Sequence, residues 1–222
     1  MLKTQGVNAQ AAFIKANTEL LAPPLVPELR LHLASETVPL WRQSEEDLAR
    51  QGLDPPFWAF AWAGGQALAR YILDTPSSVY GHSVLDFGAG SGLVGIAAGK
   101  AGARTVICAD IDPMASTACA LNAAANGVSL MTTTEDLVGT SLEGIDVVLA
   151  GDMCYEEPLA STIAAWLRDH VAKGRPVLIG DPKRHGFPAA GVEKLEDYAV
   201  ETPAELEDMA LRRTAVWRLS PA

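Results

Sequence analysis

The stretch that decides the fold is Val84-Leu85-Asp86-Phe87-Gly88-Ala89-Gly90-Ser91-Gly92. Its first four residues predict a short strand, and a helix is expected to follow over Leu93 to Ala101. The glycines at alternate positions allow a tight turn and let a ligand lie against bare amide groups. Strand, glycine turn and helix in this order predict a binding loop at the edge of a sheet.

The acidic residue before the glycines indicates which ligand the loop holds. We expect Asp86 to point toward that ligand, where a carboxylate suits a cation or a hydroxyl and repels a pyrophosphate. S-adenosylmethionine carries an ammonium and a sulfonium but no phosphate, so it is the favoured ligand. Gly90-Ser-Gly92-Leu-Val-Gly95 also fits the dinucleotide pattern G-x-G-x-x-G, which by itself indicates NAD or FAD. A tight turn that binds nothing is the structural alternative.

A second acidic residue follows the next predicted strand. Asp110 lies after 105–109 and can accept hydrogen bonds from ribose hydroxyls. Both S-adenosylmethionine and NAD carry such hydroxyls, so Asp110 supports an adenosine cofactor without choosing between them. Ser91 does not fit the nucleophile elbow G-x-S-x-G, because positions 89 and 93 are alanine and leucine, and this excludes that hydrolase pattern.

Strands and helices alternate from residue 84 onward, which is typical of a parallel sheet with helices on both faces. Asp112 and Pro113 suit the N-cap and first turn of a helix. The expected strands cover 84–87, 105–109, 128–132, 145–150 and 176–180, followed by a closing antiparallel pair at 198–202 and 210–219. The expected helices cover 93–101, 113–126, 159–171 and, as a short one, 189–195. The predicted fold class is α/β: a Rossmann-like, seven-stranded sheet, mostly parallel with a C-terminal antiparallel strand.

The N-terminal part is expected to extend this core. The patterns predict helices over 8–21 with Asn8 as N-cap, 44–52 and 65–74, and a strand over 28–35 with His32 on its solvated face. Four aromatic residues crowd together: Phe57, Trp58, Phe60 and Trp62. They are interpreted either as a plug that seats the N-terminal segment or as an aromatic wall beside a cofactor or a cation. We expect one domain over 1–222, with 1–56 as an extension packed on the core.

Composition narrows the classes of partner. The chain has 222 residues and a formal net charge of -10 at pH 7, which argues against non-specific binding to nucleic acid or to an anionic membrane. The charge suits a basic or lysine-bearing partner, or solubility alone. Cys108, Cys119 and Cys154 are isolated, so we expect reduced thiols and no metal site. Residues 1–10 lack an apolar signal core and no apolar run reaches about 18 residues, so a cytoplasmic protein is expected.

Asp86-Phe-Gly88-Ala-Gly90-Ser-Gly92 with Ala109-Asp110-Ile-Asp112-Pro113 resembles the class I, seven-strand methyltransferases. Three further segments indicate one family within this class: Trp58-Ala-Phe-Ala-Trp62-Ala-Gly64-Gly65-Gln66, Gly151-Asp152-Met-Cys-Tyr155-Glu156-Glu157 and Val177-Leu-Ile-Gly180-Asp181-Pro182. They resemble the electron transfer flavoprotein β-subunit lysine methyltransferases, within the seven-strand protein-lysine methyltransferases that carry an acidic-x-x-Tyr motif. The resemblance runs from about Phe57 to Trp217 and is that of a bacterial-type member.

This resemblance implies a protein-lysine N-methyltransferase of class EC 2.1.1 that uses S-adenosylmethionine and releases S-adenosylhomocysteine. It implies the electron transfer flavoprotein β subunit as substrate, with a ribosomal stalk protein as a further one, and a monomer or weak oligomer. Asp152 would orient the ε-amine, and would take its proton directly or through water, while Tyr155 would position the amine or shape the channel. The structural alternatives are an N-cap of the following helix for Asp152 and a core aromatic for Tyr155.

The predicted cofactor-binding residues are Trp62, Gly65, Asp86, Gly88, Ala89, Gly90, Gly92, Asp110, Ile111 and Asp152. The adenine is expected against 131–134, with Glu135 or Asp136 either accepting a hydrogen bond from its amino group or solvated. Residues 183–185 (Lys-Arg-His) either meet an acidic patch on a protein partner or form a solvated loop. The rival functions are a small-molecule, nicotinamide-like N-methyltransferase, a non-catalytic binder of the cofactor and, more distantly, a dehydrogenase.

Overall fold

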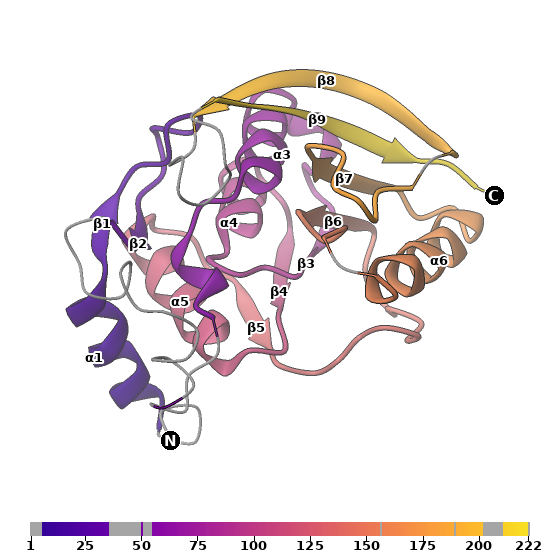
Figure 1. Ribbon diagram of the computed structural model, residues 1–222. Coiled ribbons are helices and arrows are strands. Elements are labelled where there is room, and N and C mark those ends of the chain that lie inside the picture. The colour runs from indigo at the N-terminus through magenta and orange to yellow at the C-terminus, as the bar shows by residue number, and fades with distance from the viewer. Residues whose placement is uncertain are drawn as a thin grey trace.

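A single seven-stranded sheet organises the molecule, in the order β5-β4-β3-β6-β7-β9-β8 (Figure 1). The computed structural model describes residues 6–35, 50, 55–155, 157–188, 190–201 and 211–221. The strands are β3 (Ser83–Phe87), β4 (Thr105–Ala109), β5 (Met131–Thr133), β6 (Val147–Gly151), β7 (Val177–Asp181), β8 (Val192–Glu201) and β9 (Leu211–Leu219). β3 to β7 pair in parallel, and β9 runs antiparallel to both of its neighbours. The predicted fold class is confirmed.

Helices cover both faces of this sheet (Figure 1). One face carries α3 (Ala63–Asp74), α4 (Leu93–Lys100) and α5 (Pro113–Ala125), and the other carries α6 (Leu159–Ala172). The remaining elements are α1 (Val7–Asn17), β1 (Glu19–Leu21), β2 (Leu31–Leu33) and the short 3-10 helices η3 (Phe57–Ala59) and η4 (Pro76–Ser78). α5 begins as predicted, because the Asp112 side chain accepts a hydrogen bond from the Met114 N–H and Pro113 occupies the first turn.

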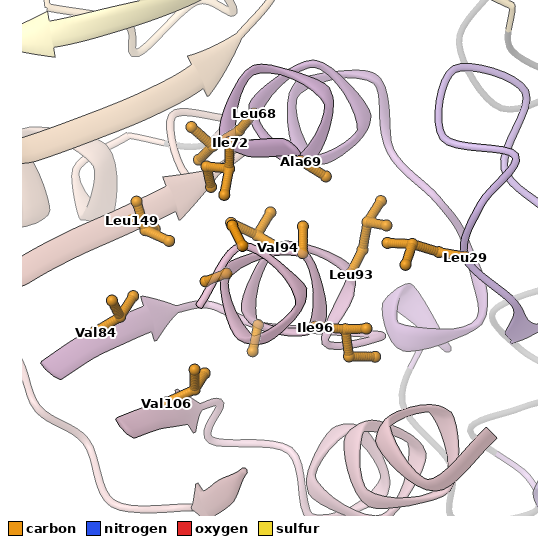
Figure 2. Packing of buried hydrophobic residues seen from close by; sticks show 14 of the residues in the cluster. Leu29, Leu68, Ala69, Ile72, Val84, Leu93, Val94, Ile96, Val106 and Leu149 are labelled. Carbon is orange, nitrogen blue, oxygen red and sulfur yellow. The ribbon is translucent and has the colours of Figure 1, made fainter. Parts of the chain in front are cut away.

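The core divides into two layers because successive strand residues point to opposite faces. Val84, Val106 and Leu149 pack against α3 and α4, and Figure 2 shows Leu68 and Ile72 above Leu149, with Val94 beside it. The alternate positions, such as Leu85, Val148 and Ile179, face α6. Burial on both faces explains why the parallel strands read as nearly continuous apolar runs. The same alternation places residue 86 on the side of α4.

The N-terminal segment is seated on α5 and the main core. Asn122 accepts a hydrogen bond from the His32 N–H at 2.7 Å and donates one to the Ser91 carbonyl at 2.8 Å. Leu29 and Leu31 lie in the same apolar cluster as α3 and α4. A separate cluster gathers Trp58, Ile14 and Met114. The plug interpretation therefore holds for Trp58 among the four crowded aromatic residues.

The helix predicted over 8–21 is wrong at both ends. Its N-cap is Gly6 rather than Asn8, and the helix ends at Asn17. Residues 19–21 instead pair with 31–33 as an antiparallel hairpin, and the Thr18 hydroxyl donates to the Ile14 carbonyl at the helix end. Pairing with a distant strand overrode the local helical pattern. His32 of that hairpin is half-buried, not solvated, and lies 3.2 Å from the Thr18 hydroxyl through Nδ1.

The short helix predicted over 189–195 is also wrong. Residues 192–201 form β8, an edge strand that pairs along β9 and carries exposed charged residues. Such charges discourage further strand pairing at a sheet edge. The third and fourth strands begin later than predicted, at Met131 and Val147. Apart from Arg50, the helix predicted over 44–52 lies outside the described residues, as do Ala189, Thr202 and Ala210. No helix in the described part of the chain has the length and hydropathy of a membrane span.

Candidate functional site

The glycine loop after β3 lies at the carboxyl edge of the parallel strands. Gly88, Gly90 and Gly92 have φ values of +68°, +50° and +78°, a region in which a side chain is strained. The N–H groups of residues 88 and 89 donate to the Ala109 carbonyl, that of 90 to Asp110, and that of 92 to the Ala89 carbonyl. These N–H groups therefore have acceptors within the protein, and the contact of a ligand with this backbone stays a prediction. The loop offers a tightly turned backbone with almost no side chains.

Asp86 does not point to the open side of this loop. Its residue is 1% exposed, and Oδ2 accepts a hydrogen bond of 2.8 Å from the Gly95 N–H in the first turn of α4. Burial raises the pKa of Asp86 to about 7, and the charge of Asp110 adds to this. The expected orientation toward a ligand is wrong, because the strand period directs the side chain to α4. A direct contact with the cofactor stays a prediction, and this burial disfavours it.

Asp110 organises the loop from the end of β4. Oδ2 accepts from the Gly90 N–H at 2.9 Å, and Oδ1 accepts from the Asp112 N–H at 3.0 Å. A carboxylate is also the kind of group that accepts hydrogen bonds from ribose hydroxyls. Ile111, beside it, is 73% exposed and offers an apolar surface at the same edge. This arrangement suits an adenosine group.

Asp152 follows β6 and joins two other segments. Its Oδ2 accepts a hydrogen bond of 2.8 Å from the Gly65 N–H, in the first turn of α3. Its Oδ1 accepts from Nη2 of Arg184 at 2.9 Å and from Nε at 3.2 Å. The alternative that Asp152 caps the following helix is wrong, because the N-cap of α6 is Pro158. The carboxylate instead accepts a hydrogen bond from the first turn of α3.

Two glycines allow α3 to begin this close to the strands. A Cβ on Gly64 would lie 2.2 Å from the Gly180 carbonyl oxygen and 2.6 Å from Oδ2 of Asp152. A Cβ on Gly180 would lie 2.1 Å from the Gly64 carbonyl oxygen. Both distances are far below van der Waals contact. The start of α3 therefore reaches Asp152 only because residues 64 and 180 have no side chain.

Aromatic rings gather beside this carboxylate. The Phe57 ring lies 6.1 Å from the Trp62 ring and 6.3 Å from the Tyr155 ring, and the Phe60 ring lies 5.8 Å from that of Trp62. Phe57 is 54% exposed and Tyr155 is 48% exposed. Tyr155 is therefore not a core aromatic. Except for Trp58, the crowded aromatic residues form a wall in which Phe57 is exposed and Phe60 and Trp62 are half-buried, and Trp62 lies against Arg184, the partner of Asp152.

Two residues of this site, Asp181 and Arg184, are not among the predicted catalytic or cofactor-binding residues. Asp181 is fully buried at the end of β7, Oδ1 accepts from the Arg184 N–H at 2.7 Å, and burial raises its pKa to about 7. The Arg184 guanidinium turns inward to Asp152 and lies 5.8 Å from the centre of the Trp62 ring. For Arg184 the solvated-loop alternative is therefore wrong, and a contact with a partner's acidic patch stays a prediction. The signal was a carboxylate directly after an apolar strand.

Other predicted residues lie apart from this cluster. Glu135 and Asp136 are both exposed after β5, and Asp136 Oδ1 accepts from the Val138 N–H, so their roles stay predictions.

Met153 lies against the glycine loop, because a Cβ on Gly88 would be 2.0 Å from its sulfur. The three cysteines are free and buried. In the part of the chain that the structure describes, no group of three or more His, Cys, Asp or Glu side chains could hold a metal ion.

Comparison with known proteins gives the following relatives. The family model for ribosomal protein L11 methyltransferase (PrmA) matches residues 67–165. The electron transfer flavoprotein beta subunit lysine methyltransferase of Mus musculus is 37% identical over 95% of this chain and 84% of its own length. A crystal structure of ribosomal protein L11 methylase from Lactobacillus delbrueckii subsp. bulgaricus is similar with a TM-score of 0.57 at 22% identity, covering 91% of this chain and all of that one. Magnesium protoporphyrin IX methyltransferase from Synechocystis PCC 6803, solved with bound SAM, has a TM-score of 0.52 at 19% identity, covering 71% and 80%.

Proposed function

Because the chain belongs to the electron transfer flavoprotein β subunit lysine methyltransferase family, we propose that it transfers methyl groups from S-adenosylmethionine to a lysine of a protein substrate. Membership rests on similarity over 95% of the chain, and it confirms the resemblance that the motifs indicated. The chain is a methyltransferase by family and by fold. The identity of the substrate and the roles of single residues are the proposed part.

The residues present fit the cofactor. The glycine loop leaves a surface with almost no side chains, Asp110 places an acidic side chain of the kind that bonds hydroxyls at the end of β4, and Ile111 offers an apolar face for a base. Residues 87–92 contain no lysine or arginine that would neutralise a pyrophosphate. When bound, S-adenosylmethionine supplies a methyl group on a positively charged sulfur, which is an activated leaving group.

The observation that carries the proposal is the anchored carboxylate of Asp152, whose partner Arg184 lies against the Trp62 ring, together with the neighbouring exposed rings of Phe57 and Tyr155. A carboxylate held by the protein orients an amine by accepting its hydrogen bond. Aromatic faces attract an ammonium group and exclude water from it. A lysine must lose its proton before it can accept a methyl group, and its free pKa is about 10.4. An apolar surrounding favours the neutral amine.

We infer that the substrate is the electron transfer flavoprotein β subunit, the protein named in the relatives that match nearly the whole chain. A second candidate is a ribosomal stalk protein. It is favoured by the family model over 67–165 and by the L11 methyltransferase of Aliivibrio salmonicida, which is 42% identical over 41% of this chain. The buried free cysteines fit a reducing compartment, the cytoplasm.

The test is transfer of labelled methyl groups to three purified acceptors in parallel: the electron transfer flavoprotein β subunit, ribosomal protein L11 and nicotinamide. We expect labelled lysine in the flavoprotein subunit, located by peptide mass spectrometry. Label in nicotinamide alone would assign the small-molecule alternative. Calorimetric binding of S-adenosylhomocysteine without label in any acceptor or in a bacterial lysate would favour a non-catalytic binder.

Two variants test the roles of the acceptor-side residues. We expect Asp152→Asn and Tyr155→Phe each to lower kcat by about 10- to 100-fold, the effect of losing one hydrogen bond that involves a charged group or forms in the reacting complex. The dissociation constant of S-adenosylhomocysteine, measured by calorimetry, should change less than about 3-fold, which is about 0.7 kcal/mol. Near-normal methylation by Asp152→Asn would remove that residue from the mechanism.

A further inference from the structure

One chain of hydrogen bonds joins three segments behind the candidate acceptor site. Asp181, at the end of β7, accepts from the Arg184 N–H at 2.7 Å. The Arg184 guanidinium donates twice to Oδ1 of Asp152, and Oδ2 of Asp152 accepts from the Gly65 N–H. The chain thus links the ends of β6 and β7 to the first turn of α3.

The ion pair in this chain is shielded from water. The side chain of Arg184 is 18% exposed and that of Asp152 is 9% exposed, and the Trp62 ring lies against the guanidinium. Screening by solvent and salt is weak for such a pair. The planar guanidinium of Arg184 donates to Oδ1 of Asp152 from two nitrogens, and this pair of bonds restricts the orientation of the carboxylate.

The backbone at Asp152 needs this support. Its φ is +56°, in the left-handed region, although it is not glycine. Such a conformation persists only where surrounding contacts hold it. The Asp152 N–H donates to the Gly180 carbonyl at 2.9 Å, so backbone and side chain are both tied to the segment that carries Arg184.

Asp181 sets the turn from which Arg184 reaches inward. Its residue is 0% exposed, and Oδ2 has no hydrogen-bond partner among the described residues. Burying a carboxyl group with an unpaired oxygen is costly. Its bond to the Arg184 N–H fixes the start of that side chain three residues further on.

We propose that Arg184 is a positioning residue for methyl transfer: it holds the Asp152 carboxylate, ionised and in one orientation, for the acceptor amine, and Asp181 holds Arg184 in place. This inference rests on the proposed function only in assigning the acceptor amine to Asp152. Arg184 touches Asp152 rather than the reacting atoms, so its removal changes the rate of transfer and not the binding of the cofactor.

The kinetic test compares R184A, R184Q and R184K with R218A. Arg218 lies opposite Leu178, near the amino end of β7, and forms an exposed pair with Glu193 at 3.0 Å, so R218A removes the same kind of group outside the hydrogen-bond chain. We expect R184A to lower kcat about 10- to 100-fold with KM for S-adenosylmethionine within about 3-fold, and R218A to match the wild type. Millimolar guanidinium ion should restore part of the kcat of R184A. R184K should restore less than the wild-type side chain, because an ammonium lacks the planar fork. R184Q serves where R184A does not fold.

A second readout needs no acceptor. In the amide NMR spectrum, R184A or R184Q should shift the Gly65 resonance, because the carboxylate that accepts from it loses its anchor, and R218A should leave it unchanged. An unmoved Gly65 amide would overturn the proposal even if no substrate were found, whereas a missing substrate alone would count only against the proposed function. A lower KM for the protein acceptor with unchanged kcat in R184A, together with inhibition by guanidinium, would also overturn it. That result would mean that Arg184 occupies the acceptor-amine position.

Discussion

Asp86 belongs to the stretch that decides the fold, but its side chain is buried and bonds to the protein rather than facing the open side of the loop. It caps the first turn of α4 through the Gly95 N–H and lies next to Cys108. A Cβ on Gly95 would be 3.2 Å from its Oδ2 and 2.5 Å from the Cys108 sulfur, so the glycine makes room for the contact. The acidic position thus stabilises the helix that follows the glycine loop.

The raised pKa of Asp86 predicts how the free energy of unfolding changes with pH. An unfolded aspartate has a pKa of about 3.9, and burial raises that of Asp86 to about 7. The folded state therefore binds more protons between these values, so stability falls as the pH rises from about 4 to 7, and the full cost remains above pH 7. Asp86→Asn keeps an acceptor for the Gly95 N–H and removes this cost, which amounts to at most about 4 kcal/mol. We expect a flatter stability curve in urea unfolding between pH 4.5 and 8.5.

Asp181 provides the control for this measurement. Burial also raises its pKa to about 7, with a further contribution from the charge of Asp152, so it adds a dependence of the same sign. Asp86→Asn alone should remove part of the slope, and the double change with Asp181→Asn should remove more. An unchanged slope in Asp86→Asn would show that Asp86 does not titrate in this range.

The start of α3 shows how an element is set by close backbone approach. Trp62 precedes this helix, and its indole N–H donates to the Phe57 carbonyl at 3.0 Å, which holds the ring against η3. Residue 64 packs against β7, and residue 65 donates to Asp152. The first turn of α3 therefore contacts β7, the Asp152 carboxylate and the aromatic residues around Trp62.

Neighbouring glycines in this turn should respond differently to alanine. Gly64→Ala forces α3 away from the Gly180 carbonyl and should lower the free energy of unfolding by about 1–3 kcal/mol, with a loss of methyl transfer. Gly65→Ala is the matched control, since its nearest new contacts would be Leu93 and Val94 side chains at 3.9 Å, and the fold should keep its stability. Urea unfolding and calorimetry with S-adenosylhomocysteine measure both effects. Weaker cofactor binding by a stable Gly65→Ala would support the predicted role of Gly65.

At the scale of the whole molecule, the N-terminal segment shares its core with the sheet. The buried Leu29 and Leu31 pack in the same cluster as α3 and α4. The Asn126 side chain accepts a hydrogen bond from the Arg30 N–H and donates one to the Arg30 carbonyl. We therefore propose that the chain is a single domain, with 1–56 as an extension that folds together with the core.

This proposal predicts a single unfolding transition. Leu31→Ala should lower the free energy of unfolding by about 2–5 kcal/mol, because it removes a fully buried side chain, and both tryptophan fluorescence and circular dichroism should move together. Leu20→Ala, in the partner strand and 43% exposed, should change it by less than about 0.5 kcal/mol. An early, separate loss of the N-terminal segment in either signal would contradict a single domain.

Local patterns were sufficient for the parallel strands, the glycine turn and the Asp112 cap, because each depends on residues close together in the chain. They also placed Asp110 and Asp152 at one edge, since parallel strands end on the same side. They failed for 19–21 and 192–195, where pairing with distant strands decided the conformation. The direction of Asp86 and the pairing of Asp152 with Arg184 were settled by the tertiary structure, because residues 32 positions apart meet only when β6 and β7 lie side by side.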